Sequence, residues 1–425
     1  MLDGEGVVLP AVLHGLDALF REDAVRQVLE WQMPSDLPFG TRRDDRWSLV
    51  SSLQKAIRRG DVRAAMFAAH AVYDLDVPHL LRRLVVCAVE DVMLGNLYGV
   101  AATLALAGDV ASRRIAGERK TLVWLAGVLA GGWKDRSACN LCVLVEYDRD
   151  VHALGAEWFR LADDDLARRV ANPNLPLNER MLAAWLLAGT KTFPGQGLPP
   201  ENSRSRRRLM AEMVTSGMPL VLYYIADRAA LRGAGGLFVP LQLLWRLHLE
   251  NDEPLRLVRG AYQADPGSGG FLLAALDMHT REGKTAISRL ASLPGIRCHI
   301  DAVPLSTRDL ALQIAVFNVE GGGLDLRVGT NQLIKLHRQA IEVEFGYCGL
   351  SDAAQRQDLL KAVRRELPQL HRFRRATGFQ LTLRETSPVQ GHSQPSLLTL
   401  PDEAASPPLR APIRPHGPPI VSDTL

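Results

Sequence analysis

Acid, base and imidazole groups are concentrated in one octapeptide, which reads DMHTREGK over residues 277–284 and follows the apolar run FLLAAL. Asp277 and His279 are spaced so that they can share a proton, and Arg281 or Lys284 can hold a phosphate. The pattern places no nucleophile beside this pair. It therefore indicates a structural or binding role, with His279 anchoring the end of a helix to the backbone. An enzyme centred on residues 277–284 is the alternative.

Two clusters of arginine and lysine are candidates for DNA contact, because grouped cations bind phosphates without regard to base sequence. The first cluster lies on one expected helix, and the second precedes a helix that we expect to begin near residue 209. Their members are Lys55, Arg58 and Arg59, and Arg204, Arg206, Arg207 and Arg208. The segment HRFRR over residues 371–375 is a similar candidate.

These cations also have ordinary uses inside a folded domain. Basic helix faces are usually solvated, and the acidic residues of the same segment offer internal partners. We expect Arg82 and Arg83 to form ion pairs with Glu90 and Asp91. The cluster at residues 204–208 is the stronger candidate for a phosphate partner, because positive charge at the start of a helix opposes the helix dipole.

Other polar patterns do not form recognisable sites. Cys139 and Cys142 are a lone C-x-x-C, and the segment CHID over residues 298–301 offers two or three metal-ligand types, whereas zinc needs four ligands. The acidic runs at residues 148–150 and 163–165 do not identify a two-metal set. We expect no metal and no cofactor, with these groups used in packing and at helix surfaces.

A short peptide after residue 376 is similar to the Gln-Leu-x-Leu-Phe motif with which bacterial proteins dock on the sliding clamp. Its matching positions are Gln380, Leu381 and Leu383, and Arg384 replaces the closing aromatic residue. Since that aromatic residue supplies much of the binding energy in such pockets, clamp docking is an accessory hypothesis.

Composition limits the classes of protein to consider. Hydrophobic residues make up 47% of the 425 residues and charged residues 23%, as in soluble globular proteins. The net charge of +3 gives no whole-chain argument for nucleic-acid binding. Five sparse cysteines argue against a disulfide framework, and no apolar run approaches the ~18 residues of a membrane span. We expect a cytoplasmic protein with no membrane contact.

Helical periodicity dominates the chain, so the sequence predicts a mainly α fold. Asp61 and Pro78 mark the starts of two helices, and the best strand candidate is the short run 315–319. We expect five segments: an N-terminal helix and linker (1–46), a helical domain (47–147), a second helical domain (148–330), C-terminal helices (331–385) and a disordered Pro-rich tail (386–425).

Segment 47–147 resembles the C-terminal helical domain of the replication-associated recombination protein A family (RarA, also called MgsA), which are clamp-loader-like AAA+ ATPases. The family carries S-x-x-H-K-S-x-R-G-S-D-x-x-A-A, then R-R-L…A-S-E-D-I-G. The matching positions are Ser51, Lys55, Arg58, Asp61, Ala64 and Ala65, followed by Arg82, Arg83, Leu84, Ala88, Glu90 and Asp91. Gln54 stands in place of the family's histidine.

The resemblance implies a collar-like helical domain that forms oligomers and acts with an ATPase at stalled replication forks. The ATPase itself is not expected here, because 46 residues precede the segment and no G-x-x-x-x-G-K-[ST] loop occurs. We therefore expect no nucleotide, and we favour a non-enzymatic role over a catalytic one.

The leading hypothesis is a non-enzymatic accessory protein of DNA replication or repair, of phage or mobile-element origin as one option. It would self-associate, or dock on a clamp-loader-type assembly, through residues 47–147. The alternative is a helical interaction scaffold that binds a host protein and has no nucleic-acid role.

Overall fold

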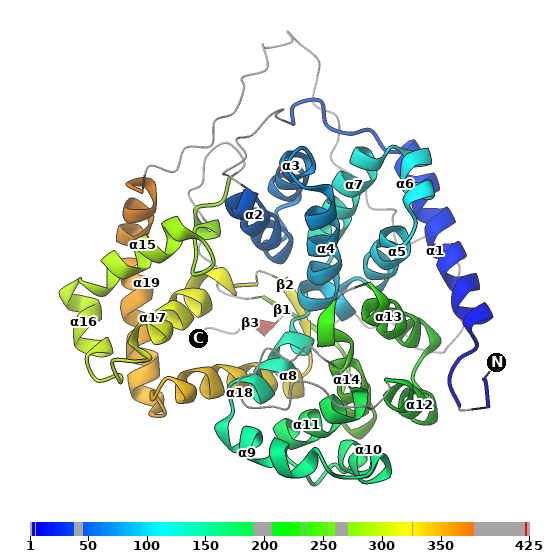
Figure 1. The fold of residues 1–425 in the computed structure, drawn as a ribbon. Helices are drawn as coiled ribbons and strands as arrows, with labels where there is room; N and C mark the ends of the chain where they lie inside the picture. Colours follow the sequence, from blue (N-terminus) through cyan, green and yellow to red (C-terminus); the bar gives the residue numbers. More distant parts are fainter. Residues whose placement is uncertain are drawn as a thin grey trace.

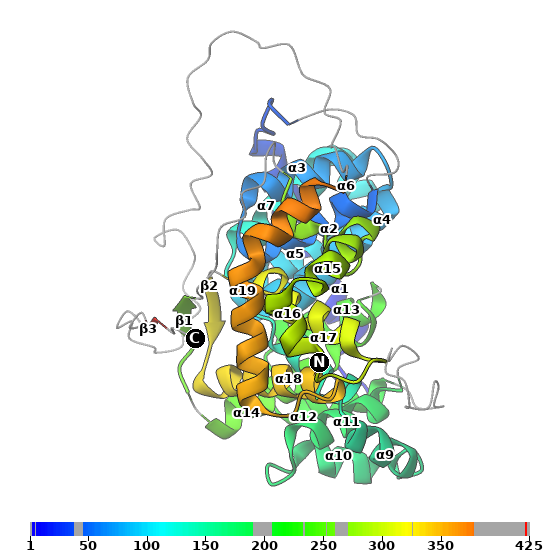
Figure 2. The same ribbon diagram turned by 90° about the vertical axis from the view of Figure 1, so that its left-hand side faces the viewer.

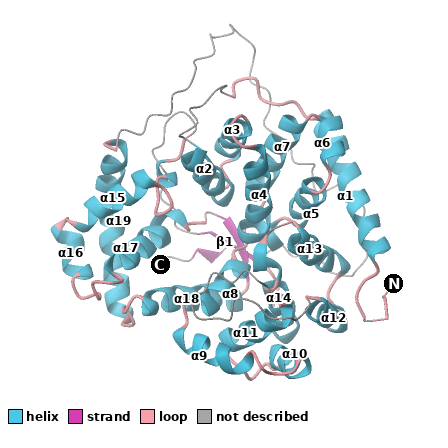
Figure 3. Cartoon of the chain, in the orientation of Figure 1, coloured by secondary structure: helices cyan, strands magenta, loops and turns pink. Residues whose placement is uncertain are grey.

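The computed structural model shows a chain built almost entirely of helices, which confirms the predicted mainly α fold (Figure 1, Figure 3). It describes residues 2–4, 6–37, 46–189, 206–232, 234–251, 253–259, 271–324, 326–377 and 421–422. Most of the predicted disordered tail, 386–425, lies outside these ranges. Within them, no helix combines the length and the apolar character that crossing a membrane requires.

The first helices follow the start signals of the sequence. Gly60, with φ +76°, ends one helix, and the Asp61 carboxylate caps the next by accepting from the Ala64 N–H at 2.9 Å. Asp76 caps the helix containing Pro78 in the same way, through the His79 N–H at 2.9 Å. These helices are α1 (Pro10–Glu30), α2 (Arg46–Arg59), α3 (Val62–Tyr73), α4 (Val77–Cys87), α5 (Leu97–Ala107), α6 (Val110–Ala116) and α7 (Glu118–Gly131).

The next group of helices shares a hydrophobic core with the first. This core runs from α1 to the end of the group and includes Leu53, Leu122, Leu141, Leu182 and Leu243. The expected divisions at 46/47 and 147/148 therefore run through one continuous core. The added helices are α8 (Ser137–Glu146), α9 (Arg149–Trp158), α10 (Asp163–Ala171), α11 (Leu177–Ala188), α12 (Arg207–Thr215), α13 (Leu220–Leu231) and α14 (Pro240–Asn251).

A second hydrophobic core lies beside the first and joins the remaining helices (Figure 2). Ile287, Leu312, Phe345 and Leu370 belong to it, so it includes residues from both sides of the expected division at 330/331. Its helices are α15 (Arg281–Ala291), α16 (Pro294–Ile300), α17 (Arg308–Val316), α18 (Asn331–Tyr347) and α19 (Ala353–Arg375), with the π-helical turn η6 (Phe317–Gly321) and the 3₁₀ turn η5 (Leu273–Ala275).

Strands are short in the described part of the chain. Strand β1 (Arg256–Arg259) pairs antiparallel with β2 (Leu326–Gly329), and β3 (Val421–Ser422) lies parallel to β1. The strand expected at 315–319 is wrong, because these residues complete α17 and form η6. Ile314, Ala315 and Val316 are all buried, and burial of consecutive residues suits a helix packed on several sides better than a half-exposed strand.

Candidate functional site

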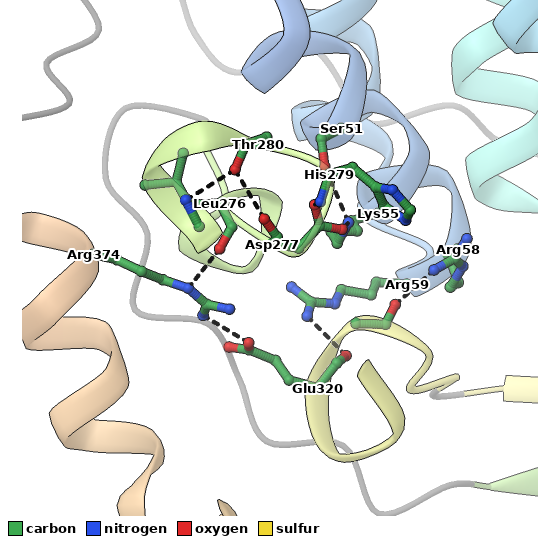
Figure 4. A network of polar contacts seen from close by, with 12 residues as sticks. Ser51, Lys55, Arg58, Arg59, Leu276, Asp277, His279, Thr280, Glu320 and Arg374 are labelled. Carbon is green, nitrogen blue, oxygen red and sulfur yellow. Dashed lines mark hydrogen bonds and ion pairs between the residues drawn. The ribbon is translucent and has the colours of Figure 1, made fainter. Parts of the chain in front are cut away.

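Two segments that the sequence singled out separately meet in the interior. Lys55 on α2 forms an ion pair with Asp277, which lies between η5 and α15, and also donates to the Ser51 hydroxyl at 3.0 Å (Figure 4). The side chains of Lys55 and Asp277 are 4% and 8% exposed. The first basic cluster therefore contacts the polar octapeptide rather than solvent.

Arg58, one turn after Lys55, joins two other elements. Its Nε donates to Asp91 Oδ1 at 2.7 Å, and its Nη1 donates to the Gly321 carbonyl at 2.7 Å. Arg136 Nη1 lies 3.2 Å from the same Asp91 oxygen. Asp91 thus neutralises two guanidinium groups and connects α2 to the segment before α8.

The predicted ion pairs of α4 have different partners in the structure. Asp91 pairs with Arg58 and Arg136, and Glu90 lies 3.4 Å from Arg136, rather than either carboxylate pairing with Arg82 or Arg83. Arg82 is exposed on α4. Glu90 and Asp91 lie in a π-helical turn, Ala88–Val92, that follows α4, and this turn breaks the α-helical spacing that the prediction assumed.

Glu320 is the second acidic centre and connects η6 to α19. Its carboxylate lies 2.5 Å from His371 Nε2 and accepts from Arg374 Nη1 at 2.7 Å. Arg374 Nε donates to the Leu276 carbonyl at 2.8 Å, and Arg59 Nη2 donates to the Glu320 carbonyl at 3.1 Å. We call these residues, with Lys55, Arg58, Asp91, Arg136 and Asp277, the buried charge network.

Burial and pairing compete in setting the charge of this network. Burial favours the neutral form of each carboxyl group, but the neighbouring cations outweigh it and lower the pKa of Asp277, of Asp91 and of Glu320, the last to about 2. Burial lowers the pKa of Lys55, and the Asp277 carboxylate opposes that shift. The network therefore holds ionised pairs in a low-dielectric interior.

The space beside Asp277, Glu320 and Arg374 is too small for a substrate. A cavity of about 10 Å³ touches Asp277, Glu320 and Arg374, which is room for roughly one water molecule. This geometry lets the charges hold the two cores together. It gives a reacting molecule no access to the Lys55–Asp277 pair.

Three side chains of the octapeptide are exposed, those of His279, Arg281 and Lys284. His279 is exposed and only its backbone N–H reaches Asp277, at 2.9 Å, so the imidazole and the carboxylate do not share a proton. Thr280 caps α15 by accepting from the Gly283 N–H at 3.1 Å. Arg281 and Lys284 then lie on the exposed side of α15, and the four predicted polar residues do not converge.

Lys55, Arg58 and Arg59 are 3%, 3% and 8% exposed, and their side chains have partners inside the fold instead of facing solvent. In the second basic cluster, Arg207 lies 2.6 Å from Asp3 and Arg208 lies 2.7 Å from Asp164.

Several other predicted positions are not described. Arg204, and the clamp-docking positions Gln380, Leu381 and Leu383, lie outside the described residues. Arg206, directly before α12, is half-buried.

An exposed basic surface that was only partly anticipated covers α15 and α19, which pack side by side (Figure 2). The side chain of Arg281 is 92% exposed. We call seven exposed cations of the two helices the α15–α19 basic face: Arg281, Lys284, Arg289, Lys361, Arg365, Arg372 and Arg375. Arg364 on α19 is also exposed, and it lines the larger cavity described below. Acidic neighbours moderate three of the seven: Glu282 beside Arg281, Asp358 beside Lys361 and Glu366 beside Arg365.

The candidate metal ligands stay dispersed. No three His, Cys, Asp or Glu side chains are placed to hold a metal ion in the ranges that the structure describes. Cys139 and Cys142 are half-buried on α8, and burial raises the pKa of both thiols, that of Cys139 to about 11. At neutral pH these thiols are protonated, which fits packing better than redox use.

A larger cavity, of about 240 Å³, lies on the far side of Arg136 from Asp91, between α8, η6, β2, α18 and α19. The sequence did not point to it. Its polar residues come from five elements and include Arg136, Asn140, His337, Glu344 and Arg364. They come from segments far apart in the sequence, residues 136–140, 337–344 and 364, so only the packing of the two cores brings them together.

Comparison with known proteins adds no relative: no protein-family model, no curated protein and no solved structure matches this chain.

Proposed function

We propose that this chain is a non-enzymatic accessory protein of DNA replication or repair, which contacts the nucleic-acid backbone through the α15–α19 basic face. The observation that carries the proposal is the concentration of exposed cations on these two helices. The collar-like segment 47–147 would join the protein to a second copy or to a clamp-loader-type assembly.

The charge of the two helices is out of proportion to that of the chain. Helix α19 has seven Arg and Lys against two Asp and Glu, and five of the seven are exposed, because Arg356 and Arg374 are buried. Helix α15 has three against one, and all three are exposed. Since the whole chain has a net charge of only +3, the remaining residues together are net negative. A local positive face on a nearly neutral protein is the electrostatic pattern of a polyanion-binding surface.

The side chains on α15 are of the types that contact phosphates. Arg281, Lys284 and Ser288 follow one another at helical spacing, with Arg289 beside Ser288. At a rise of 1.5 Å per residue they lie about 5 to 6 Å apart along the helix, close to the spacing of successive phosphates. Arg, Lys and Ser are typical phosphate ligands, and contacts of this kind are independent of base sequence.

The collar resemblance gains support from the roles of its residues. Lys55 and Arg58 make buried ion pairs, and Asp61 caps α3. The matching positions thus include an N-cap and two buried cations that connect α2 to other elements. Because the partners Asp277 and Gly321 belong to later segments of the chain, this face of the collar-like segment is already occupied, and an assembly contact would use another face.

A helical interaction scaffold with no nucleic-acid role is the second candidate. The observation that favours it is the internal use of the predicted DNA-binding cations: Lys55, Arg58 and Arg59 are buried, and Arg207 and Arg208 pair with carboxylates. On this hypothesis the α15–α19 basic face is a solvated surface or meets an acidic protein.

Fluorescence anisotropy with labelled single-stranded and duplex DNA, at several salt concentrations, separates the two candidates. We expect the R281A/K284A/R289A variant to lose about tenfold in affinity and to reduce the slope of log K against log salt by about 2 to 3. The matched control R26A/R63A/R168A removes three exposed arginines on other helices and should bind like the wild type. Equal affinities of both variants, or no binding by the wild type, would refute the DNA contact.

Light scattering and affinity capture test the second part of the proposal, that the protein associates with a second copy of itself or with a clamp-loader-type assembly. Self-association predicts a dimer or larger species at micromolar concentration, and the alternative docking mode predicts recovery of replication proteins from the native cell. A monomer that captures only unrelated proteins would contradict this part and favour the scaffold.

A further inference from the structure

We propose that the 240 Å³ cavity between α8, α18 and α19 is a binding site for a small organic anion, a monoester phosphate or carboxylate with a body of about one ring. This goes beyond the proposed function, because the cavity lies in the interior junction of the two cores and is separate from the seven residues of the α15–α19 basic face.

The polar groups that line the cavity are held in place by hydrogen bonds to neighbouring residues. Arg136 donates to Cys139 Sγ at 3.0 Å and lies over the Phe317 ring at 5.3 Å. Asn318 donates to the Ile314 carbonyl at 3.0 Å and lies 3.3 Å from Glu344 Oε2. These bonds hold polar groups at the cavity without filling it, which is the preorganisation that ligand sites require.

Glycine keeps the η6 wall close to the cavity. A Cβ added at Gly322 would lie 2.9 Å from the Phe317 ring, and one at Gly321 would lie 3.1 Å from it. The ring therefore packs against bare backbone, and the chain at Gly322 and Gly323 lines the cavity. A side chain at residue 322 would push Phe317 from its contact with Arg136.

The electrostatics of the lining favour a negative ligand. Arg136, Arg327 and Arg364 approach the cavity from three elements, while burial raises the pKa of Glu344 to about 7. Burial, together with Arg327 and Arg136, lowers the pKa of His337 to about 4. At neutral pH the imidazole is therefore neutral and Glu344 is about half protonated. Asp135 also lines the cavity, and burial raises the pKa of its carboxyl group. The three arginines thus still outnumber the acidic groups of the lining.

The remaining wall sets the shape and size of the ligand. Leu333, Ile334, Ile341 and Leu360 supply apolar lining to the cavity. A cavity of about 240 Å³ is larger than the ~150 Å³ that accommodates benzene and smaller than typical drug-sized pockets. One ring or a short aliphatic chain with a single anionic group fits both the volume and the mixed polar and apolar lining.

Isothermal titration of the full chain with phenyl phosphate, benzoate and the neutral analogue benzyl alcohol tests the proposal. We expect at least one anion to bind and benzyl alcohol to bind about tenfold more weakly. Binding of phenyl phosphate alone would indicate a phosphate ester and binding of benzoate a carboxylate. No binding of either anion at millimolar concentration, or equal binding of benzyl alcohol, would overturn the site.

Two variants locate the binding in this cavity. Arg364 is exposed where it lines the cavity, so R364A should leave the fold intact and weaken the anion about threefold to tenfold. K335A removes an exposed cation of α18 that lies outside both the cavity lining and the α15–α19 basic face, and is the control for R364A. E344Q removes the carboxyl group that faces Arg136 and Asn318, with Glu146 nearby. In the wild type, ionisation of Glu344 should weaken anion binding between pH 6 and pH 8. E344Q should abolish this decline in affinity and bind the anion several-fold more tightly than the wild type at pH 8. Unchanged binding in both R364A and E344Q would exclude this cavity.

Discussion

Glu320 gives the sharpest test of the buried charge network. Its carboxylate accepts from Arg374 at 2.7 Å and contacts His371 at 2.5 Å, and its pKa of about 2 lies well below the ordinary value of 4.5. A carboxyl group with a lowered pKa stabilises the folded state above its unfolded pKa and loses that contribution as pH falls through its folded pKa. At about 1.4 kcal/mol per unit, the ionised form contributes about 3 kcal/mol at neutral pH.

The substitution Glu320→Gln should therefore reduce the free energy of unfolding by about 3 kcal/mol at pH 7. The same relation gives a difference of about 1.5 kcal/mol at pH 3, because this carboxyl group is then protonated in the unfolded chain and must lose its proton on folding. Leaving the fully buried Arg374 without its partner acts in the same direction. Urea unfolding followed by circular dichroism, at both pH values, measures the difference.

Glu366 on α19, the helix that also carries Arg374, provides the matched control. Its side chain is 27% exposed and lies 3.6 Å from Arg365 at the surface, so Glu366→Gln should cost less than about 1 kcal/mol. If Glu320→Gln cost no more than this control, or if its effect did not shrink at pH 3, the assignment of an ionised, stabilising Glu320 would be wrong.

Three further predictions concern single contacts. Asp61→Ala removes the N-cap of α3 and should lower stability by about 1 kcal/mol, which thermal unfolding detects; Asp36→Ala, at an exposed ion pair, should have almost no effect. Lys55→Met or Asp277→Leu alone should cost about 3 to 5 kcal/mol, whereas the double variant should recover much of the loss; additive losses would show that the pair is not coupled. Because the pKa of Glu344 is raised to about 7, ionisation destabilises the fold at higher pH, so the stability gain of Glu344→Gln should grow by about 2 kcal/mol from pH 5 to pH 8; a constant gain would contradict the shift.

The sequence alone was sufficient for the local features. Helical periodicity predicted the mainly α fold, and Asp61 and Pro78 marked true helix starts, because caps and proline act through neighbouring backbone groups. The polar octapeptide also proved to be an important segment, although its role in the fold is to supply Asp277 and the cap of α15.

Tertiary structure decided which charged side chains are exposed and can contact a ligand. From sequence, Lys55 and Lys284 are equivalent cations on helices, but one is buried against Asp277 and the other is exposed on α15. The partner of Lys55, Asp277, lies 222 residues further along the chain, and no local sequence pattern contains that information. The 240 Å³ cavity between α8, α18 and α19 also depends on tertiary structure, because its lining residues come from five elements. Side-chain type and spacing thus determined the helices, and the packing of the two cores determined which side chains can meet a ligand, because burial and pairing depend on neighbours that sequence spacing does not encode.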